Sequence, residues 1–380
     1  MIKNVTKIAA FAAGVIIIIM LLDIPFRGGD WYLRGYLADR DARIAGIQEE
    51  PEGQIDVLNV GDSLANVAIT PPEMYRDYGI TSYTMGRDLQ KCIETYYAIK
   101  LASRNQKIKV VLWEVHNMCK HQTGYDPYII GISEYTKFRS QFIKYHYVWK
   151  NIWEEKSIRK YFKGYVVSEK VVPYEKDVPY FDLSKTEAYD VPSDQKYVFK
   201  KVYDLCQKEG IQLVLYAVPS PHCYSMRMHN GYVKLAEEYG LPFLDGNIDY
   251  EKIGIDFAAD YQDDDGDHLN LSGTRKMTKY LAEHLVKECG LTDHRNDPAY
   301  RSWEDLMSAY EQEVRDMEGT CYPDIEKERD KEESPPPGGI GKRNGSGSRS
   351  RAGKRKEPGT DRRGKGNRDH HAIQSRQIRK

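Results

Sequence analysis

A serine, a histidine and an aspartate in this 380-residue chain are placed where they could form a nucleophilic site. Ser63 follows directly after a short apolar run that ends at Gly61. Asp265 and His268 stand three residues apart in an acidic loop far along the chain. A carboxylate can hold one imidazole nitrogen while the other nitrogen takes the proton of a serine hydroxyl, which is a weak nucleophile without such a base. We therefore expect Ser63 to be the nucleophile, His268 the general base and Asp265 the group that orients the histidine.

Plainer interpretations exist for both places. Ser63 could cap the helix that follows it, since serine is a preferred residue at helix N-termini. His268 could pack locally in a solvated acidic loop. The elements around these residues decide between the interpretations, because a catalytic serine and histidine must meet at one edge of the fold.

Apolar runs of strand length alternate with segments of helical period along most of the chain. The expected strands are residues 55–60, 79–86, 107–115, 211–218 and 241–244. The expected helices are residues 71–78, 89–104, 195–208, 230–239, 273–288 and 298–318. This alternation is typical of an α/β domain with a parallel sheet and crossover helices. Ser63 and the 265–268 loop then both follow strands, at the carboxyl edge where open α/β sheets place ligands.

The composition divides the chain into five parts. We expect an apolar anchor at 1–26, a juxtamembrane segment at 27–54, an α/β domain at 55–295, a C-terminal helix at 296–325 and a disordered basic tail at 326–380. Within the α/β domain, residues 122–190 are rich in Tyr, Lys and Trp without a strong period. We interpret them as a helical and irregular insertion.

The N-terminal segment predicts an association with a membrane. Residues 8–22 are apolar and uncharged, and Lys3 and Lys7 precede them. No small-residue cleavage pattern follows the run, so an uncleaved signal anchor is favoured over a cleaved signal peptide, and a buried core helix is the third alternative. The lysines predict a cytoplasmic N-terminus, which places the rest of the chain outside the cell membrane as a single-pass protein.

The C-terminal tail predicts a charged partner of a particular kind. Its last fifty residues hold about fifteen Lys and Arg against about five acidic residues, with almost no apolar side chains. Outside a membrane, anionic wall polymers or phospholipid headgroups suit such a tail, and nucleic acid does not. A solvated tail without a partner is the alternative.

Neither a metal nor an organic cofactor is expected. His116, Cys119 and His121 lie close together, but no second Cys/His pair stands nearby. In a calcium loop centred on Gly266, Tyr261 and Ser272 would occupy ligand positions that they do not suit. The six cysteines leave the disulfide pairing open.

Two short motifs resemble those of the SGNH/GDSL hydrolase superfamily over roughly residues 53–290. These are Gly61-Asp62-Ser63-Leu64 and Asp265-x-x-His268. The resemblance implies a flavodoxin-like three-layer α/β/α fold and an oxyanion hole built from the Ser63 amide, the Gly86 amide and the Asn117 side chain. The third motif departs from the family, since Val115-His116-Asn117-Met118 stands where Gly-x-Asn-Asp is usual, so His116 or Glu114 could intrude.

An anchor followed by such a domain is similar in layout to envelope proteins that transfer D-alanyl or O-acetyl groups. We therefore expect a serine esterase or O-acyltransferase acting through an acyl-serine on acylated envelope polysaccharide or teichoic acid, together with a membrane protein that supplies the acyl group. Hydrolysis and transfer stay open, as do the acyl group, the acceptor and the oligomeric state. One alternative is a non-catalytic, membrane-anchored assembly or glycan-binding protein, and a peptidase or lipase with the same triad is another.

Overall fold

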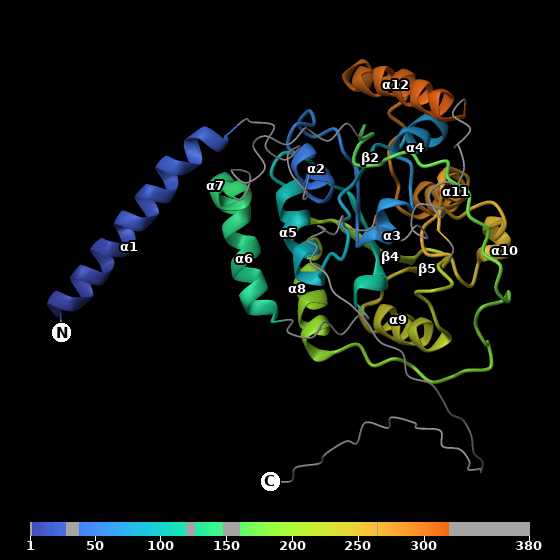
Figure 1. Ribbon diagram of the computed structural model, residues 1–380, viewed down its shortest axis with the longest axis horizontal. Helices are drawn as coiled ribbons and strands as arrows, with labels where there is room; N and C mark the ends of the chain where they lie inside the picture. Colours follow the sequence, from blue (N-terminus) through green and yellow to red (C-terminus); the bar gives the residue numbers. More distant parts are fainter. Residues whose placement is uncertain (1, 28–37, 119–125, 147–159, 264, 319–380) are drawn as a thin grey trace, which may run out of the picture. The chain divides into compact units, whose positions relative to one another are not determined.

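The computed structural model describes residues 2–27, 38–118, 126–146, 160–263 and 265–318 (Figure 1). The predicted disordered tail, Cys119, Cys321 and parts of the predicted insertion lie outside these residues. Within them, Cys206 and Cys289 are free thiols.

Five parallel strands form the sheet, in the spatial order β2-β1-β3-β4-β5. They are β1 (Val57–Val60), β2 (Ser82–Thr84), β3 (Val110–Glu114), β4 (Gln212–Ala217) and β5 (Phe243–Asp245). Each lies inside or next to a run predicted as a strand, so the parallel α/β prediction is confirmed. The chain crosses from β2 past β1 to β3, and the carboxyl edge between β1 and β3 is therefore the switch point at which such sheets place ligands.

Helices cover both faces of this sheet. The helices are α3 (Ser63–Asn66), α4 (Pro71–Tyr78), α5 (Cys92–Ala102), α8 (Ser193–Glu209), α9 (Met226–Tyr239), α10 (Tyr250–Ile253) and α11 (Leu271–Glu288). Strand residues such as Leu58 and Val111 join one buried cluster with α5, α8 and α9. Alternate residues such as Val57 and Leu112 join a second cluster with α4 and α11. The two clusters make the fold three-layered, as expected.

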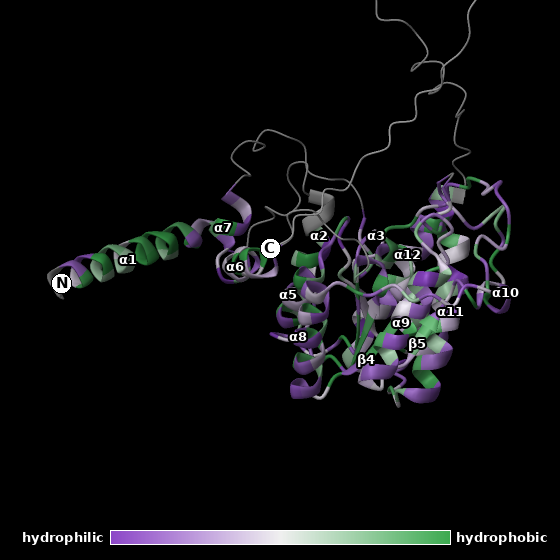
Figure 2. Ribbon diagram, turned by 90° about the horizontal axis from the view of Figure 1, so that it is seen from below, coloured by the Kyte–Doolittle hydropathy of each residue, from purple (hydrophilic) through white to green (hydrophobic). Residues whose placement is uncertain are grey.

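The N-terminal segment is a helix that ends against the domain. The stretch Asn4–Phe26 is long and apolar enough to cross a membrane, and a signal sequence would pass the same test. The N-terminal segment consists of α1 (Ile2–Asp23) and the short η1 (Ile24–Phe26). Figure 2 shows the hydrophobic character of α1. Asp23 Oδ1 accepts hydrogen bonds from Ser140 Oγ and from the Phe142 amide, both at 2.9 Å. These partners belong to the segment that connects α6 (Pro127–Arg139) to α7 (Gln141–Tyr145) and to the start of α7.

Four further elements lie in the described chain, three of them short. The short ones are α2 (Ala38–Gly46), η3 (Val115–Met118) and η5 (Pro298–Tyr300). The last helix, α12 (Arg301–Glu318), packs on α4. Trp303 of α12 is fully buried, with its ring centroid 5.2 Å from that of Tyr75. The Tyr310 hydroxyl donates to Glu73 Oε1 at 3.0 Å. These contacts join α12 to the core.

We expect Trp303→Ala to lower the free energy of unfolding by about 3–5 kcal/mol, because it removes a large, fully buried ring from a packed contact. Ser308→Ala, on the exposed side of the same helix, should change it by less than about 0.5 kcal/mol. Urea unfolding of both variants measures the difference. Equal stabilities would show that α12 does not belong to the cooperative core.

Candidate active site

The turn that carries Ser63 is built by a close approach between β1 and β3. Gly61 has φ +153°, and a Cβ there would lie 2.8 Å from Glu114 Cβ and 2.9 Å from Ala65 Cβ. Only glycine lets the chain leave β1 so near to β3. Ser63 follows as the first residue of α3, and Asp62 is the N-cap, accepting the Leu64 amide at Oδ1 over 3.1 Å.

A buried pair below the turn holds α3 from the sheet side. Asn59 Nδ2 donates to the Ala65 carbonyl at 2.8 Å. The Tyr216 hydroxyl, from β4, donates to Asn59 Oδ1 at 2.6 Å. Both side chains are fully buried. The position of Ser63 is therefore fixed by three neighbouring strands rather than by a flexible loop.

Gly86 lies beside this turn, as the resemblance implied. A Cβ at position 86 would come within 2.4 Å of Asn66 Oδ1 and 2.8 Å of the Asp62 carbonyl oxygen. Asn66 Nδ2 in turn donates to Asp88 Oδ1 at 3.1 Å. The structure thus brings the end of β2 against α3, and Asn66, which the sequence analysis missed, occupies the contact. Its place one helical turn after Ser63 is the signal that could have indicated it.

Asn117, the expected third oxyanion donor, is engaged elsewhere. Its Oδ1 accepts from Trp113 Nε1 at 3.3 Å, and its Nδ2 donates to Thr95 Oγ1 at 3.5 Å. The Cys92 thiol also contacts its Oδ1, at 3.5 Å. None of these described contacts reaches the Ser63 turn, because the side chain is directed toward α5. The expected placement of Asn117 is corrected accordingly.

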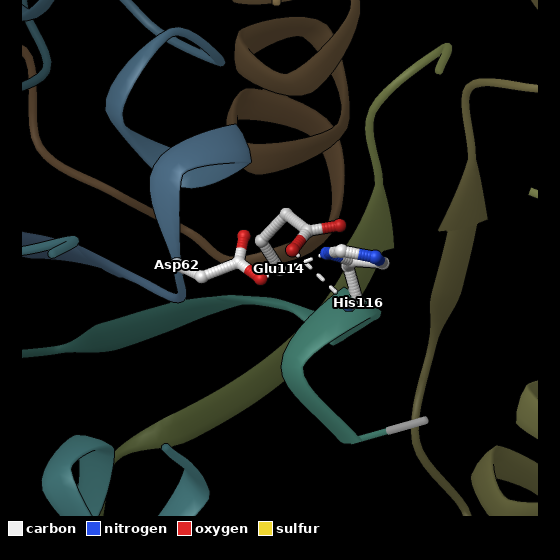
Figure 3. A group of neighbouring side chains, drawn as sticks. All are labelled: Asp62, Glu114 and His116. Carbon is white, nitrogen blue, oxygen red and sulfur yellow. Dashed lines mark hydrogen bonds and ion pairs between the residues drawn. The ribbon is translucent and has the colours of Figure 1, made fainter. Parts of the chain in front are cut away.

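His116, the neighbour of Asn117, contacts the residue that precedes Ser63. Its Nδ1 lies 2.7 Å from Asp62 Oδ2, and its backbone amide donates to Glu114 Oε2 at 3.1 Å (Figure 3). Asp62, Glu114 and His116 are all buried, and their ligand atoms lie within 4.8 Å of one another. His116, one of the residues at which the third motif departs from the resembled pattern, therefore contacts the turn that carries Ser63.

The surroundings of this cluster raise the pKa of Glu114. Burial, and secondarily the negative charge of Asp62, hold the pKa of Glu114 well above its usual range, although backbone amides of His116 and Val218 act in the opposite direction. Burial thus favours the protonated form of Glu114. The three groups are close enough to ligate a cation, but both Asp62 oxygens and Glu114 Oε2 are already hydrogen-bonded.

The partner of His268 differs from the expected one. His268 Nδ1 lies 2.8 Å from Asp263 Oδ2, which also accepts the His268 amide at 3.1 Å. Asp263 Oδ1 accepts the Asp267 amide at 2.8 Å. Asp265 instead points outward, with 54% of its side chain exposed and its Oδ1 3.5 Å from Lys176 Nζ. The expected contact between Asp265 and His268 is thus corrected: Asp263 lies beside the imidazole, because its oxygens also accept the backbone amides of the loop.

The electrostatics of His268 suit a base. Burial by itself lowers its pKa, but the hydrogen bond and charge of Asp263, with smaller contributions from Asp267 and Asp62, raise the pKa above the usual value. The contribution of Asp62 shows that His268 lies within electrostatic range of the residue next to Ser63. In the described part of the chain, no direct hydrogen bond joins Ser63 to His268, and such catalytic bonds often tighten only when substrate binds.

Comparisons with known proteins add a likeness of fold. No model of a protein family matches the chain, and no curated protein matches it. A solved structure from Bacteroides fragilis, whose assignment as an acylhydrolase is provisional, is similar at 12% identity and a TM-score of 0.35. The match covers 64% of this chain and 94% of the other. A likeness of this degree carries no conclusion about activity.

We expect Glu114→Gln to change how stability depends on pH. An acid whose folded pKa is raised contributes stability at low pH, and this contribution is lost as the pH rises through the folded pKa. The glutamine variant should match the wild type near the unfolded pKa of glutamate and exceed it at alkaline pH, by about 1.4 kcal/mol for each unit of the raised pKa. Urea midpoints across the pH range measure this, with exposed Glu237→Gln as the control. A parallel pH dependence in wild type and Glu114→Gln would contradict the raised pKa of Glu114.

Proposed function

We propose that this protein is a serine esterase or acyltransferase that works through an acyl-Ser63 intermediate. The observation that carries the proposal is the Asp263–His268 pair, which lies at the same carboxyl edge as a serine held on a rigid strand-to-helix turn. The triad logic depends on such roles and geometry rather than on sequence spacing.

The reaction follows from the proton positions. Ser63 Oγ attacks the carbonyl carbon of an ester while His268 Nε2 takes the hydroxyl proton, and Asp263 holds Nδ1–H so that Nε2 is free to accept it. His268 then returns this proton to the departing alkoxide, which leaves as an alcohol. Water or a sugar hydroxyl attacks the acyl-serine next and gives its proton to His268, which passes it to Ser63 Oγ as the bond between the acyl group and the serine breaks. Water completes hydrolysis, whereas the hydroxyl completes transfer.

The developing oxyanion needs donors near Ser63. The proposal assigns the backbone N–H groups of Ser63, at the start of α3, and of Gly86, which lies against the same turn. Asn117 remains a proposed third donor only if its amide leaves Thr95 during the reaction.

The setting of the enzyme is also proposed. With α1 as an uncleaved anchor and Lys3 and Lys7 on the cytoplasmic side, the α/β domain would face the envelope. Acylated envelope polysaccharide or teichoic acid is the proposed substrate class, with a membrane protein as acyl donor in the transfer reaction. The basic tail would contact anionic polymer or lipid.

A fluorophosphonate probe should label the full-length wild-type chain in mild detergent, because the probe reacts with activated serines. Ser63→Ala should abolish labelling, and His268→Ala should slow it by about 10²-fold or more. Gel fluorescence after timed labelling measures both. If the folded wild type stays unlabelled, the binding-protein alternative replaces the enzyme proposal.

Asp263→Asn and Asp265→Asn should behave differently. Removing Asp263 deletes the charge that raises the pKa of His268, so the acidic limb of the labelling rate should move to lower pH while the maximal rate falls by about 10²-fold or more. Asp265→Asn removes a carboxylate of the same loop that does not contact His268, and it should leave both unchanged. Second-order labelling constants from acid to neutral pH make the comparison. A loss confined to Asp265→Asn would restore the original assignment.

A further inference from the structure

The surface of α6 carries apolar side chains where a surface helix is normally polar. Four of its large side chains are exposed: Tyr128, Ile129 and Ile132 at 66% each, and Tyr135 at 46%. Outside α1, no other described helix exposes so many large apolar side chains. Exposed apolar patches of this kind mark contact surfaces.

The inner side of α6 already has a partner. Ile130 and Phe138 pack against the core cluster that contains α5, and Gly131 lies against Ile93. Figure 1 shows α6 on the outer side of α5. The helix is therefore apolar on both sides, and core packing explains only one of them, since amphipathic surface helices keep a polar outer face.

The location of α6 indicates what covers the other side. The chain passes from α6 through Ser140 into α7, and Ser140 is the residue whose hydroxyl binds Asp23 at the end of α1. The rings of Phe26 and Phe142 also meet, with centroids 5.7 Å apart. If α1 spans a membrane, these contacts hold the C-terminal end of α6 at the membrane surface.

The side chains of α6 match the chemistry of that surface. Tyr128 and Tyr135 are amphipathic rings of the kind enriched at membrane interfaces. The Arg139 guanidinium lies 5.4 Å from the Tyr135 ring centroid, and the Arg104 guanidinium lies 3.6 Å from that of Phe138. Aromatic and aliphatic residues flanked by cations are typical of helices that lie in the headgroup layer.

We propose that the face formed by Tyr128, Ile129, Ile132 and Tyr135 rests on the lipid bilayer that holds α1. The inference depends on the anchoring part of the proposed function and is independent of the catalytic part. It makes the attachment two-point, with α1 through the membrane and α6 on it. The α/β domain is thereby held against the bilayer through its α5 side rather than tethered freely.

The test places a fluorescent amino acid in the full-length chain, reconstituted in vesicles of phosphatidylcholine and phosphatidylglycerol. The probe replaces Ile132 in one sample, exposed Val286 of α11 in a second and Ile17 of α1 in a third. Lipids brominated in their acyl chains quench a probe that contacts them. We expect quenching at positions 17 and 132 to exceed that at position 286 severalfold.

A charged substitution on this face provides a matched pair of variants. Ile129→Glu should reduce quenching at position 132 toward the level of position 286, whereas Leu183→Glu should not. Both side chains are exposed enough to tolerate the change. Quenching at position 17 but not at 132 would overturn the proposal while leaving the anchor intact. Blue-shifted emission at 132 without quenching would also overturn it, since a second copy or a partner protein would then cover the face. No quenching at position 17 would overturn the anchor and this inference together, whereas fluorophosphonate labelling of Ser63 reports separately on catalysis.

Discussion

The buried carboxylate of Asp62 is the group around which the carboxyl edge between β1 and β3 is arranged. An ionised carboxylate removed from water costs several kcal/mol unless its oxygens are hydrogen-bonded. Asp62 uses one oxygen to cap α3 through the Leu64 amide and the other to meet His116 at the end of β3. Both contacts are needed to keep it inside, so the turn that carries Ser63 is fixed to two strands at once. The hydrogen bonds that satisfy this carboxylate therefore also hold the Ser63 turn in place.

Glu114 lies beside Asp62 in the same buried cluster. Two carboxylates this close together in a buried site cannot both ionise without a large penalty, and burial and the charge of Asp62 raise the pKa of Glu114. The remaining charge on Asp62 extends to the opposite loop, where it contributes to the raised pKa of His268. The charge of Asp62 therefore acts on both Glu114 and His268, although no hydrogen bond between the cluster and His268 is described.

The sequence predicted the sheet better than the site, for a physical reason. Strands such as Val110–Glu114 are buried on both faces, and their apolar runs are visible without any knowledge of contacts. The partner of His268 depends on the path of one loop, in which Asp263 meets the imidazole and Asp265 is exposed. Similarly, the side chain of His116 in the short η3 helix meets Asp62, whereas that of its neighbour Asn117 meets Thr95. Spacing identifies the loop in each case but cannot determine which side chain faces inward.

The described part of the predicted insertion is hydrogen-bonded to the chain on both sides of His268. The Val172 amide donates to the Tyr261 carbonyl at 2.9 Å, the Tyr174 amide to the Phe257 carbonyl at 2.8 Å, and the Leu271 amide to the Ser168 carbonyl at 2.7 Å. These bonds lie on both sides of the loop that carries His268, so the segment supports the base from outside the sheet. The same segment brings the Tyr174 ring against Gly266, in the loop that carries Asp263 and His268. Because one stretch of chain is bonded on both sides of this loop and also packs against it, the orientation of His268 depends on the packing of this segment as well as on Asp263.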